Sequence, residues 1–152
     1  MQYISRETEF EPFSMESRLT VLDLCSVQNV TLDRLCISCL FCNIALSFQD
    51  KCAFAVKNLR IVFRVDTAFA CCSCCLKSVA YYELCKYYRC SADGTNLDVL
   101  SGKCLKELVV RCLTCMKQLE YVEKLEHIAR GENFHLVRHY WRGTCRHCRI
   151  PE

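Results

Sequence analysis

A pattern of cysteine pairs that occurs twice constrains this chain more than any other feature. Cys39-x-x-Cys42 and Cys72-x-x-Cys75 are separated by 29 residues, and Cys112-x-x-Cys115 and Cys145-x-x-Cys148 are separated by 29 again. Adding 73 to each position of the first set gives the second set. A fixed period of this kind indicates a duplicated structural unit. We therefore interpret the chain as a tandem duplication.

The spacing within each half is typical of a metal site. Two C-x2-C turns can place four thiolates around one ion, and a closed tetrahedron of four sulfurs is the usual form of structural zinc. Sixteen cysteines in 152 residues fit either metal binding or a disulfide scaffold. Residues 1–13 contain no apolar signal segment, so we expect reduced thiols that are free to bind metal. The sequence thus predicts two structural zinc ions.

The repeat distinguishes the ligand cysteines from the other cysteines of the chain. Cys36, Cys71 and Cys74 lie beside the first set, but their repeat partners are a valine, a threonine and a histidine inside a tight turn. We therefore exclude all three as ligands. Free cysteine usually behaves as a small buried apolar residue. We expect that behaviour of the remaining five, which are Cys25, Cys52, Cys85, Cys90 and Cys104.

Each half is predicted to be a small zinc-stabilised α+β domain, because 29 residues leave room for a helix and one or two strands. Ser47 resembles an N-cap, and a second helix is expected from about Glu120 to a C-cap at Gly131. Strands are expected over 60–65 and 134–141, where β-branched and aromatic residues gather. The helical spacing places these residues on the inward faces: Phe48, Cys52, Ala55 and Val56, and Tyr121, Leu125, Ile128 and Ala129.

Four segments follow from these patterns. We predict a flexible N-terminal arm over residues 1–18, a first zinc-binding domain over 19–78, a linker helix over 79–92 and a second zinc-binding domain over 93–152. Ser17 is expected to cap a short helix that carries Leu19, Leu22 and Leu24. Another helix is expected from about residue 96 to 110.

Several classes of function are disfavoured. The chain shows no nucleophile, base and acid in order, and its four glycines form no phosphate loop, so we predict that it is not an enzyme. A RING-type ligase would interleave its ligand pairs, and zinc would consume the thiols of an oxidoreductase. No apolar run is long enough to cross a membrane. A nucleic-acid-binding zinc protein acting on transcription is the alternative, supported only by Arg138, Arg142, Arg146 and Arg149.

Several motifs add a resemblance to a known family. They include Leu59-Arg-Ile-Val-Phe-Arg64, Val110-Arg-Cys-Leu-Thr-Cys115 and Trp141-Arg-Gly-Thr-Cys145. Together with the double cysteine spacing, these motifs resemble the papillomavirus early protein six oncoprotein family over nearly the whole chain.

The resemblance implies an adaptor that captures acidic helical LxxLL peptides of host proteins and redirects their activity or turnover. The implied partners are a HECT-type ubiquitin ligase or Mastermind-like transcription coactivators, in the host nucleus and cytoplasm. The chain ends in Arg149-Ile-Pro-Glu152, which is not a PDZ-binding tail, so no PDZ partner is expected. The sequence leaves open a weak DNA contact and a homodimer through the first domain.

The resemblance also implies a peptide groove, in which arginines face the acidic groups of the peptide. Tyr140 stands where some members carry an arginine, which makes the expected groove less cationic. By position, the apolar wall would comprise Phe41, Leu59, Val62, Phe63, Cys71, Val79 and Leu84, and the arginines would be Arg64, Arg111 and Arg138.

Overall fold

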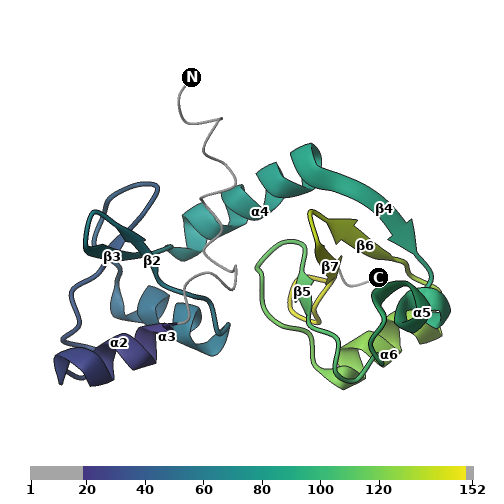
Figure 1. Ribbon diagram of the computed structural model, residues 1–152, viewed down its shortest axis with the longest axis horizontal. Coiled ribbons are helices and arrows are strands. Elements are labelled where there is room, and N and C mark those ends of the chain that lie inside the picture. Colours follow the sequence, from purple (N-terminus) through teal and green to yellow (C-terminus); the bar gives the residue numbers. More distant parts are fainter. Residues whose placement is uncertain (1–18, 150–152) are drawn as a thin grey trace. The chain divides into compact units, whose positions relative to one another are not determined.

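The computed structural model describes residues 19–149, and its chain divides after Cys75 into two compact units. No helix among these residues is long and apolar enough to span a membrane. The first unit contains α2 (Val21–Gln28), β1 (Ser38–Cys39), α3 (Phe48–Val56), β2 (Val62–Arg64), β3 (Thr67–Ala70) and the start of α4 (Ser73–Tyr87) (Figure 1). The second contains the rest of α4, β4 (Tyr88–Ala92), η2 (Gly94–Asn96), α5 (Leu97–Ser101), β5 (Val110–Cys112), α6 (Tyr121–Arg130), β6 (Phe134–Val137) and β7 (Tyr140–Gly143).

The first unit is built on a three-stranded sheet in the order β1-β3-β2. β1 pairs with β3 in parallel, and β2 pairs with β3 as an antiparallel hairpin. Helices α2 and α3 pack against each other. Apolar side chains that are almost fully buried form the core, among them Val21, Phe54, Leu59 and Ile61.

The second unit has a four-stranded sheet in the order β4-β6-β7-β5, and only the β5–β7 pair is parallel. Its core joins sheet residues to the residues before α6. The cluster comprises Ala92, Leu97, Leu108, Val110, Cys112, Leu119, Phe134, Trp141 and Cys145. The predicted class, a zinc-stabilised α+β fold in two tandem units, is confirmed.

The duplication extends to the backbone. The parallel pair Ser38↔Phe69 of the first unit recurs in the second as Arg111↔Arg142, each residue displaced by the repeat offset. Left-handed residues recur in the same way, since positive φ angles are found at Asn43 and Met116, at Asn58 and Gly131, and at Val65 and Arg138. Such φ angles are uncommon for residues other than glycine, so their repetition reflects a shared chain path rather than local preference.

The ends of both helices agree with the sequence, but the predicted inward faces are only partly right, since Cys52, Ala55 and Ile128 are half-buried while the other predicted residues are exposed. Ser47 caps α3 through its side chain, and Gly131 ends α6 in the left-handed conformation. However, Phe48 is 53% exposed and Val56 81% exposed. In α6, the buried residues are Glu123, Lys124 and His127, while Tyr121 and Leu125 are each 42% exposed. Phe54 fills the inward face of α3 together with Lys51, and the buried polar residues of both helices each have a hydrogen-bond partner there, as described below.

The strand predictions also need correction, because a hairpin stands where one strand was expected. Residues 134–141 contain β6 and β7 with a turn at Arg138, whose φ is 55°. In the first unit, the strand expected over 60–65 is the first arm of the β2–β3 hairpin, and its turn contains Val65 at a φ of 50°. A local pattern of β-branched and aromatic residues does not reveal where such a turn falls.

Two helix predictions outside the hairpins are wrong in extent. α4 begins at Ser73 and ends at Tyr87, and residues 88–92 of the expected linker helix form strand β4. The helix expected over 96–110 ends at Ser101, because Gly102 adopts a left-handed φ of 74°. Residues 103–109 turn instead, which buries Leu108 and leaves Val109 exposed.

At the start of the described residues, α2 is capped by Thr20 rather than by Ser17. Ser17 and the predicted arm over residues 1–18 lie outside the described residues. Leu24 is buried as expected, whereas Leu22 is 54% exposed.

Candidate metal centres

The first cysteine set forms a compact cage. Cys39 ends β1, Cys42 lies in the turn that follows, Cys72 follows β3, and Cys75 lies in the first turn of α4. Their four sulfurs all lie within 4.8 Å of one another, and the Sγ atoms of Cys42 and Cys72 are 3.9 Å apart. Zn–S bonds of about 2.3 Å place the sulfurs of a tetrahedral site about 3.8 Å apart. The donor set therefore fits zinc.

The second set repeats this arrangement at the ends of β5 and β7. The sulfurs of Cys112, Cys115, Cys145 and Cys148 also lie within 4.8 Å of one another, and those of Cys115 and Cys145 are 3.7 Å apart. Four thiolates complete a tetrahedral zinc site and leave no position for an exchangeable ligand. Two structural zinc ions are therefore the cofactors of this protein.

Hydrogen bonds prepare two of the sulfurs for metal binding. Burial works to raise the pKa of Cys39, but bonds from Cys42, Cys72 and Phe41 outweigh it together and lower the pKa to about 7. A hydrogen bond from the Cys115 side chain, opposed by burial, lowers the pKa of Cys112 to about 4. Both shifts favour the thiolate, which is the form that binds metal. Burial raises the pKa of Cys75 and Cys148 in the same cages, so these two thiols must lose their protons when metal binds.

In each unit, a carboxylate accepts a backbone hydrogen bond from the second ligand pair, and the sequence did not predict this contact. The backbone N–H of Arg146 donates to Oε2 of Glu123 over 2.8 Å, and the N–H of Ser73 donates to Oδ1 of Asp50 over 3.4 Å. Both donors follow a zinc ligand directly in the chain. The two acids are separated by the repeat offset, and so are the two donors. The repeat in the sequence could therefore have indicated that these residues have a shared role.

The residue after each carboxylate is a buried lysine. Its ammonium group donates hydrogen bonds to backbone carbonyls in the segment before the first ligand pair. The ammonium of Lys51 donates to the carbonyl of Leu35 over 2.8 Å, and that of Lys124 donates to the carbonyl of Leu108, which is the repeat partner of Leu35. Lys51 is 5% exposed and Lys124 is 3% exposed. These bonds explain why cations occupy the inward faces of α3 and α6.

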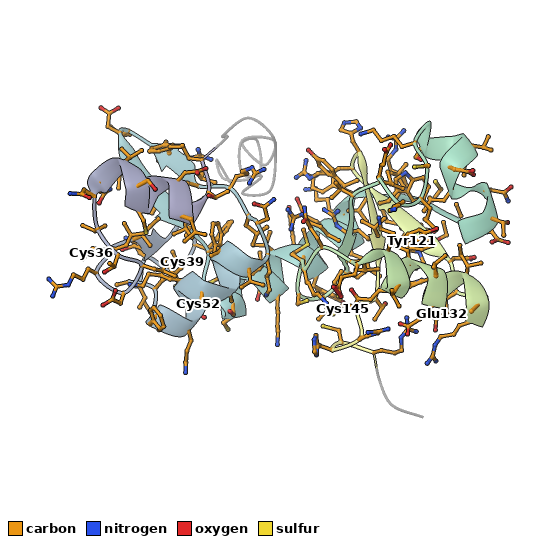
Figure 2. All side chains as sticks on the ribbon, turned by 90° about the horizontal axis from the view of Figure 1, so that it is seen from below. Cys36, Cys39, Cys52, Tyr121, Glu132 and Cys145 are labelled. Carbon is orange, nitrogen blue, oxygen red and sulfur yellow. The ribbon has the colours of Figure 1, made fainter. Side chains whose placement is uncertain are left out.

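The remaining cysteines differ from the expectation of burial. Cys36 and Cys74 lie outside both cages, as expected, and are exposed. Figure 2 shows Cys36 near the outer edge of its unit and Cys39 further inside. Cys25 is buried and Cys52 is half-buried. The prediction is wrong for three residues, because Cys85, Cys90 and Cys104 are exposed.

The apolar residues assigned to a peptide groove fall into two groups. Leu59, Val62 and Cys71 are buried, with at most 7% of their surface exposed. Their side chains cannot be reached by a peptide without rearrangement, so their assignment as contacts is corrected. The accessible group consists of Phe63, which is 43% exposed, and of Phe41, Val79 and Leu84, which are half-buried.

The three arginines assigned to the groove are engaged within their own units. Nε of Arg138 lies 2.9 Å from Oε2 of Glu83, so this arginine already has a carboxylate partner. Arg111 is 7% exposed and donates to the carbonyl of Met116 over 2.8 Å. Arg64 donates to the carbonyl of Phe63 over 2.9 Å and keeps part of its surface exposed.

Three of the four arginines in the segment that suggested nucleic-acid binding have a carboxylate partner. Arg146 pairs with Glu126 at 2.9 Å, Arg149 pairs with Glu132, and Arg142 is buried. Arg138 is paired with Glu83, whereas the Arg146 side chain stays 52% exposed beside Glu126, so nucleic-acid binding remains an alternative that no observation favours.

The fold and the two cages define a class of protein, that of tandem tetracysteine zinc-binding domains. The family model described as Early Protein (E6) matches residues 39–148, which span both cages. This chain belongs to the E6 family of papillomavirus oncoproteins.

Individual relatives support the family assignment. Protein E6 of human papillomavirus type 60 is 41% identical over 129 residues, which cover 85% of this chain and 91% of that protein. Protein E6 of human papillomavirus 17 is 38% identical over 130 residues, with 85% and 92% covered. Among solved structures, the C-terminal zinc-binding domain of the HPV51 oncoprotein E6 matches at a TM-score of 0.38 and 32% identity, covering 41% of this chain and 80% of that one.

Proposed function

We propose that this protein is a non-enzymatic adaptor that binds acidic helical LxxLL peptides of host proteins and redirects their activity or turnover. Membership of the E6 family carries the proposal. The closed tetracysteine sites agree with it, because they leave zinc no coordination position for catalysis and suit a scaffold that presents binding surfaces.

Accessible apolar residues support the peptide contact. Phe63 on β2 is 43% exposed, and Val79 and Leu84 on α4 are half-buried. Leucine side chains of a helical peptide bind by burying apolar area, so accessible residues of this kind are the ones that contribute. Leu59, Val62 and Cys71 are buried and drop out of the proposed contact set.

Arg64 is the strongest candidate for the acidic groups of the peptide. It retains exposed surface, whereas Arg111 is buried against its own unit and Arg138 is paired with Glu83. Substituting Arg111 would disturb the fold as well as any binding site. Arg64 therefore gives the cleaner test of charge recognition.

A titration tests the adaptor proposal. The zinc-loaded protein is titrated into a fluorescent acidic LxxLL peptide, and we expect saturable binding. Arg64→Glu should weaken it by about tenfold or more, because a charged hydrogen bond is lost and a like charge is introduced. Lys103→Glu makes the same charge change at an exposed site on the second unit and serves as the control. Absence of saturable binding, or equal affinity of wild type and Arg64→Glu, would reject the proposal.

The partners and the location follow from the same proposal. A HECT-type ubiquitin ligase or a Mastermind-like coactivator would carry the LxxLL segment, and the complex would form in the host nucleus and cytoplasm. Affinity purification from cells, compared between wild type and Arg64→Glu, identifies which class is captured. Self-association through the first domain stays a prediction, for which sedimentation velocity is the measurement.

A further inference from the structure

The two cages have the same kind of ligands but different surroundings. In the second cage Cys145 is fully buried, whereas its repeat partner Cys72 is half-buried. Cys115 is half-buried, whereas its repeat partner Cys42 is exposed. Water and competing ligands therefore reach the first cage more easily than the second.

The backbone on both sides of Cys145 is held by buried side chains. The N–H of Arg146 donates to Oε2 of Glu123 over 2.8 Å, and the N–H of Thr144 donates to Nε2 of His127 over 2.9 Å. Glu123 is 1% exposed and His127 is 2% exposed. Hydrogen-bond partners outside the ligand shell orient the ligands and tune how tightly a protein holds its metal.

Further contacts fix the Glu123 carboxylate itself. Its Oε1 accepts the N–H of Glu120 over 2.8 Å, and the ammonium of Lys117 lies 3.2 and 3.3 Å from its two oxygens. A buried carboxylate is costly unless it is paired and hydrogen-bonded, and these partners supply that compensation. Glu123 is therefore firmly placed to accept from the segment that carries Cys145.

The aligned positions of the first unit hold weaker partners. The N–H of Ser73 donates to Oδ1 of Asp50 over 3.4 Å, which is long for a hydrogen bond, and Asp50 is half-buried. Ile44, which is 68% exposed, stands in place of the lysine. Phe54 stands in place of the histidine, and its phenyl ring has no nitrogen that could accept a backbone N–H. The repeat thus provides an internal comparison between two similar cages.

We propose that Glu123 and His127 are positioning residues of the second zinc site, and that the first site is therefore the one that exchanges its zinc. Both residues act through the backbone on either side of Cys145, which keeps its sulfur in place for the metal. In the exchange, zinc passes to a competing ligand and the released thiolates take up protons from water. We expect the first site to release zinc at least about tenfold faster, because loss of an outer partner typically changes metal affinity by about 10- to 100-fold.

Transfer of zinc from the full-length protein to a coloured pyridylazo-resorcinol chelator tests the proposal. We expect a fast and a slow phase of equal amplitude. Iodoacetamide added between the phases, followed by peptide mass spectrometry, identifies the emptied cage, and we expect labelled Cys42 and Cys75 rather than labelled Cys115 and Cys148. Release of both ions in a single phase, or labelling of the second cage first, would overturn the proposal.

A matched pair of substitutions on α6 isolates the role of Glu123. Glu123→Gln should speed the slow phase by about tenfold or more and leave the fast phase unchanged. Glu126→Gln is the control and should change neither phase, because Glu126 pairs with the side chain of Arg146 at 2.9 Å. An unchanged slow phase in Glu123→Gln, or equal acceleration of both phases, would contradict a positioning role.

Exchanging residues between the repeats tests the same idea in both directions. His127→Phe copies the first unit and should speed the slow phase several-fold. The double variant Ile44→Lys/Asp50→Glu copies the second unit and should slow the fast phase several-fold. A fast phase that stayed the same or became faster in the double variant would count against positioning by these side chains. None of these outcomes depends on the proposed peptide binding.

Discussion

Nε of Arg138 lies 2.9 Å from Oε2 of Glu83, and the two residues join the β6–β7 turn to α4 within the second unit. The side chain of Arg138 is 10% exposed and that of Glu83 is 3% exposed. The Arg138 guanidinium also lies 3.7 Å from the centre of the Tyr87 ring. An arginine that the sequence offered as a peptide contact thus holds a turn to a helix.

Removing Glu83 should destabilise the protein strongly. Glu83→Ala leaves the Arg138 charge buried without this carboxylate, and loss of one partner of a buried pair costs about 3 kcal/mol or more. Urea unfolding of the zinc-loaded protein measures the change. Glu107→Ala removes an exposed acid and should stay within about 0.5 kcal/mol of wild type. Equal unfolding midpoints for the two variants would contradict the role of the pair.

The repeated lysines give a second stability prediction. Lys51→Met and Lys124→Met each remove an ammonium that donates to buried carbonyls, including those of Leu35 and Leu108. An unsatisfied buried acceptor costs about 1–3 kcal/mol, so both variants should be destabilised by that amount in denaturant titrations. Lys106→Met, on the exposed surface, is the matched control. Stabilities indistinguishable from this control would show that the carbonyls find other donors.

The corrected face of α6 can be tested directly. Leu125 is 42% exposed, so Leu125→Gln should change the free energy of unfolding by no more than about 0.5 kcal/mol. His127 accepts from Thr144 and stacks on Phe134 with ring centres 4.6 Å apart. His127→Ala should therefore cost about 2 kcal/mol or more through a cavity and a lost hydrogen bond. Thermal unfolding measures the loss of stability in both variants. If Leu125→Gln were the more destabilising of the two, the inward face predicted from the sequence would be correct.

Thiol labelling tests the placement of the cysteines outside the cages. In the zinc-loaded protein, iodoacetamide should modify Cys36, Cys85, Cys90 and Cys104, because their side chains are exposed. Cys25 is buried and should react only after unfolding. Peptide mass spectrometry at increasing reaction times measures the order. Labelling of Cys25 at the rate of Cys85 would contradict the structure.

Removal of zinc should unfold both units. Each unit has a small core, and binding of a structural metal supplies folding free energy that such a core lacks. A strong chelator is expected to abolish most of the helical circular dichroism, and added zinc should restore it. Cys39→Ser and Cys112→Ser should each weaken one site, whereas Cys90→Ser removes an exposed thiol and serves as the control. A metal-free protein that kept its native spectrum would exclude a structural role for zinc.

The groove assignment shows how position alone can mislead. Leu59 and Arg138 match the family pattern by position, yet Leu59 is fully buried and Arg138 is paired with Glu83. A linear motif carries no information on whether a side chain faces solvent or a neighbouring element. Phe63 and Arg64, on the short strand β2, retain the exposure that peptide binding requires.

The sequence by itself determined the two cages. A C-x2-C turn is a local structure, and the repeat offset selected Cys72 and Cys75 over Cys71 and Cys74 without any knowledge of the fold. Helix starts and stops at Ser47 and Gly131 were readable for the same reason, because a cap depends on its nearest neighbours in the chain.

Only the tertiary structure decided which faces are buried. Lys51, Lys124 and Glu123 face inward because carbonyl and N–H groups from distant segments need partners there, and a buried unpaired polar group costs more than an exposed apolar side chain. Apolar periodicity cannot anticipate such partners, since they come from residues that lie 16 to 23 positions away. The strand expected over 134–141 forms a hairpin instead, because a left-handed turn at Arg138 reverses the chain, and the apolar pattern does not reveal that turn.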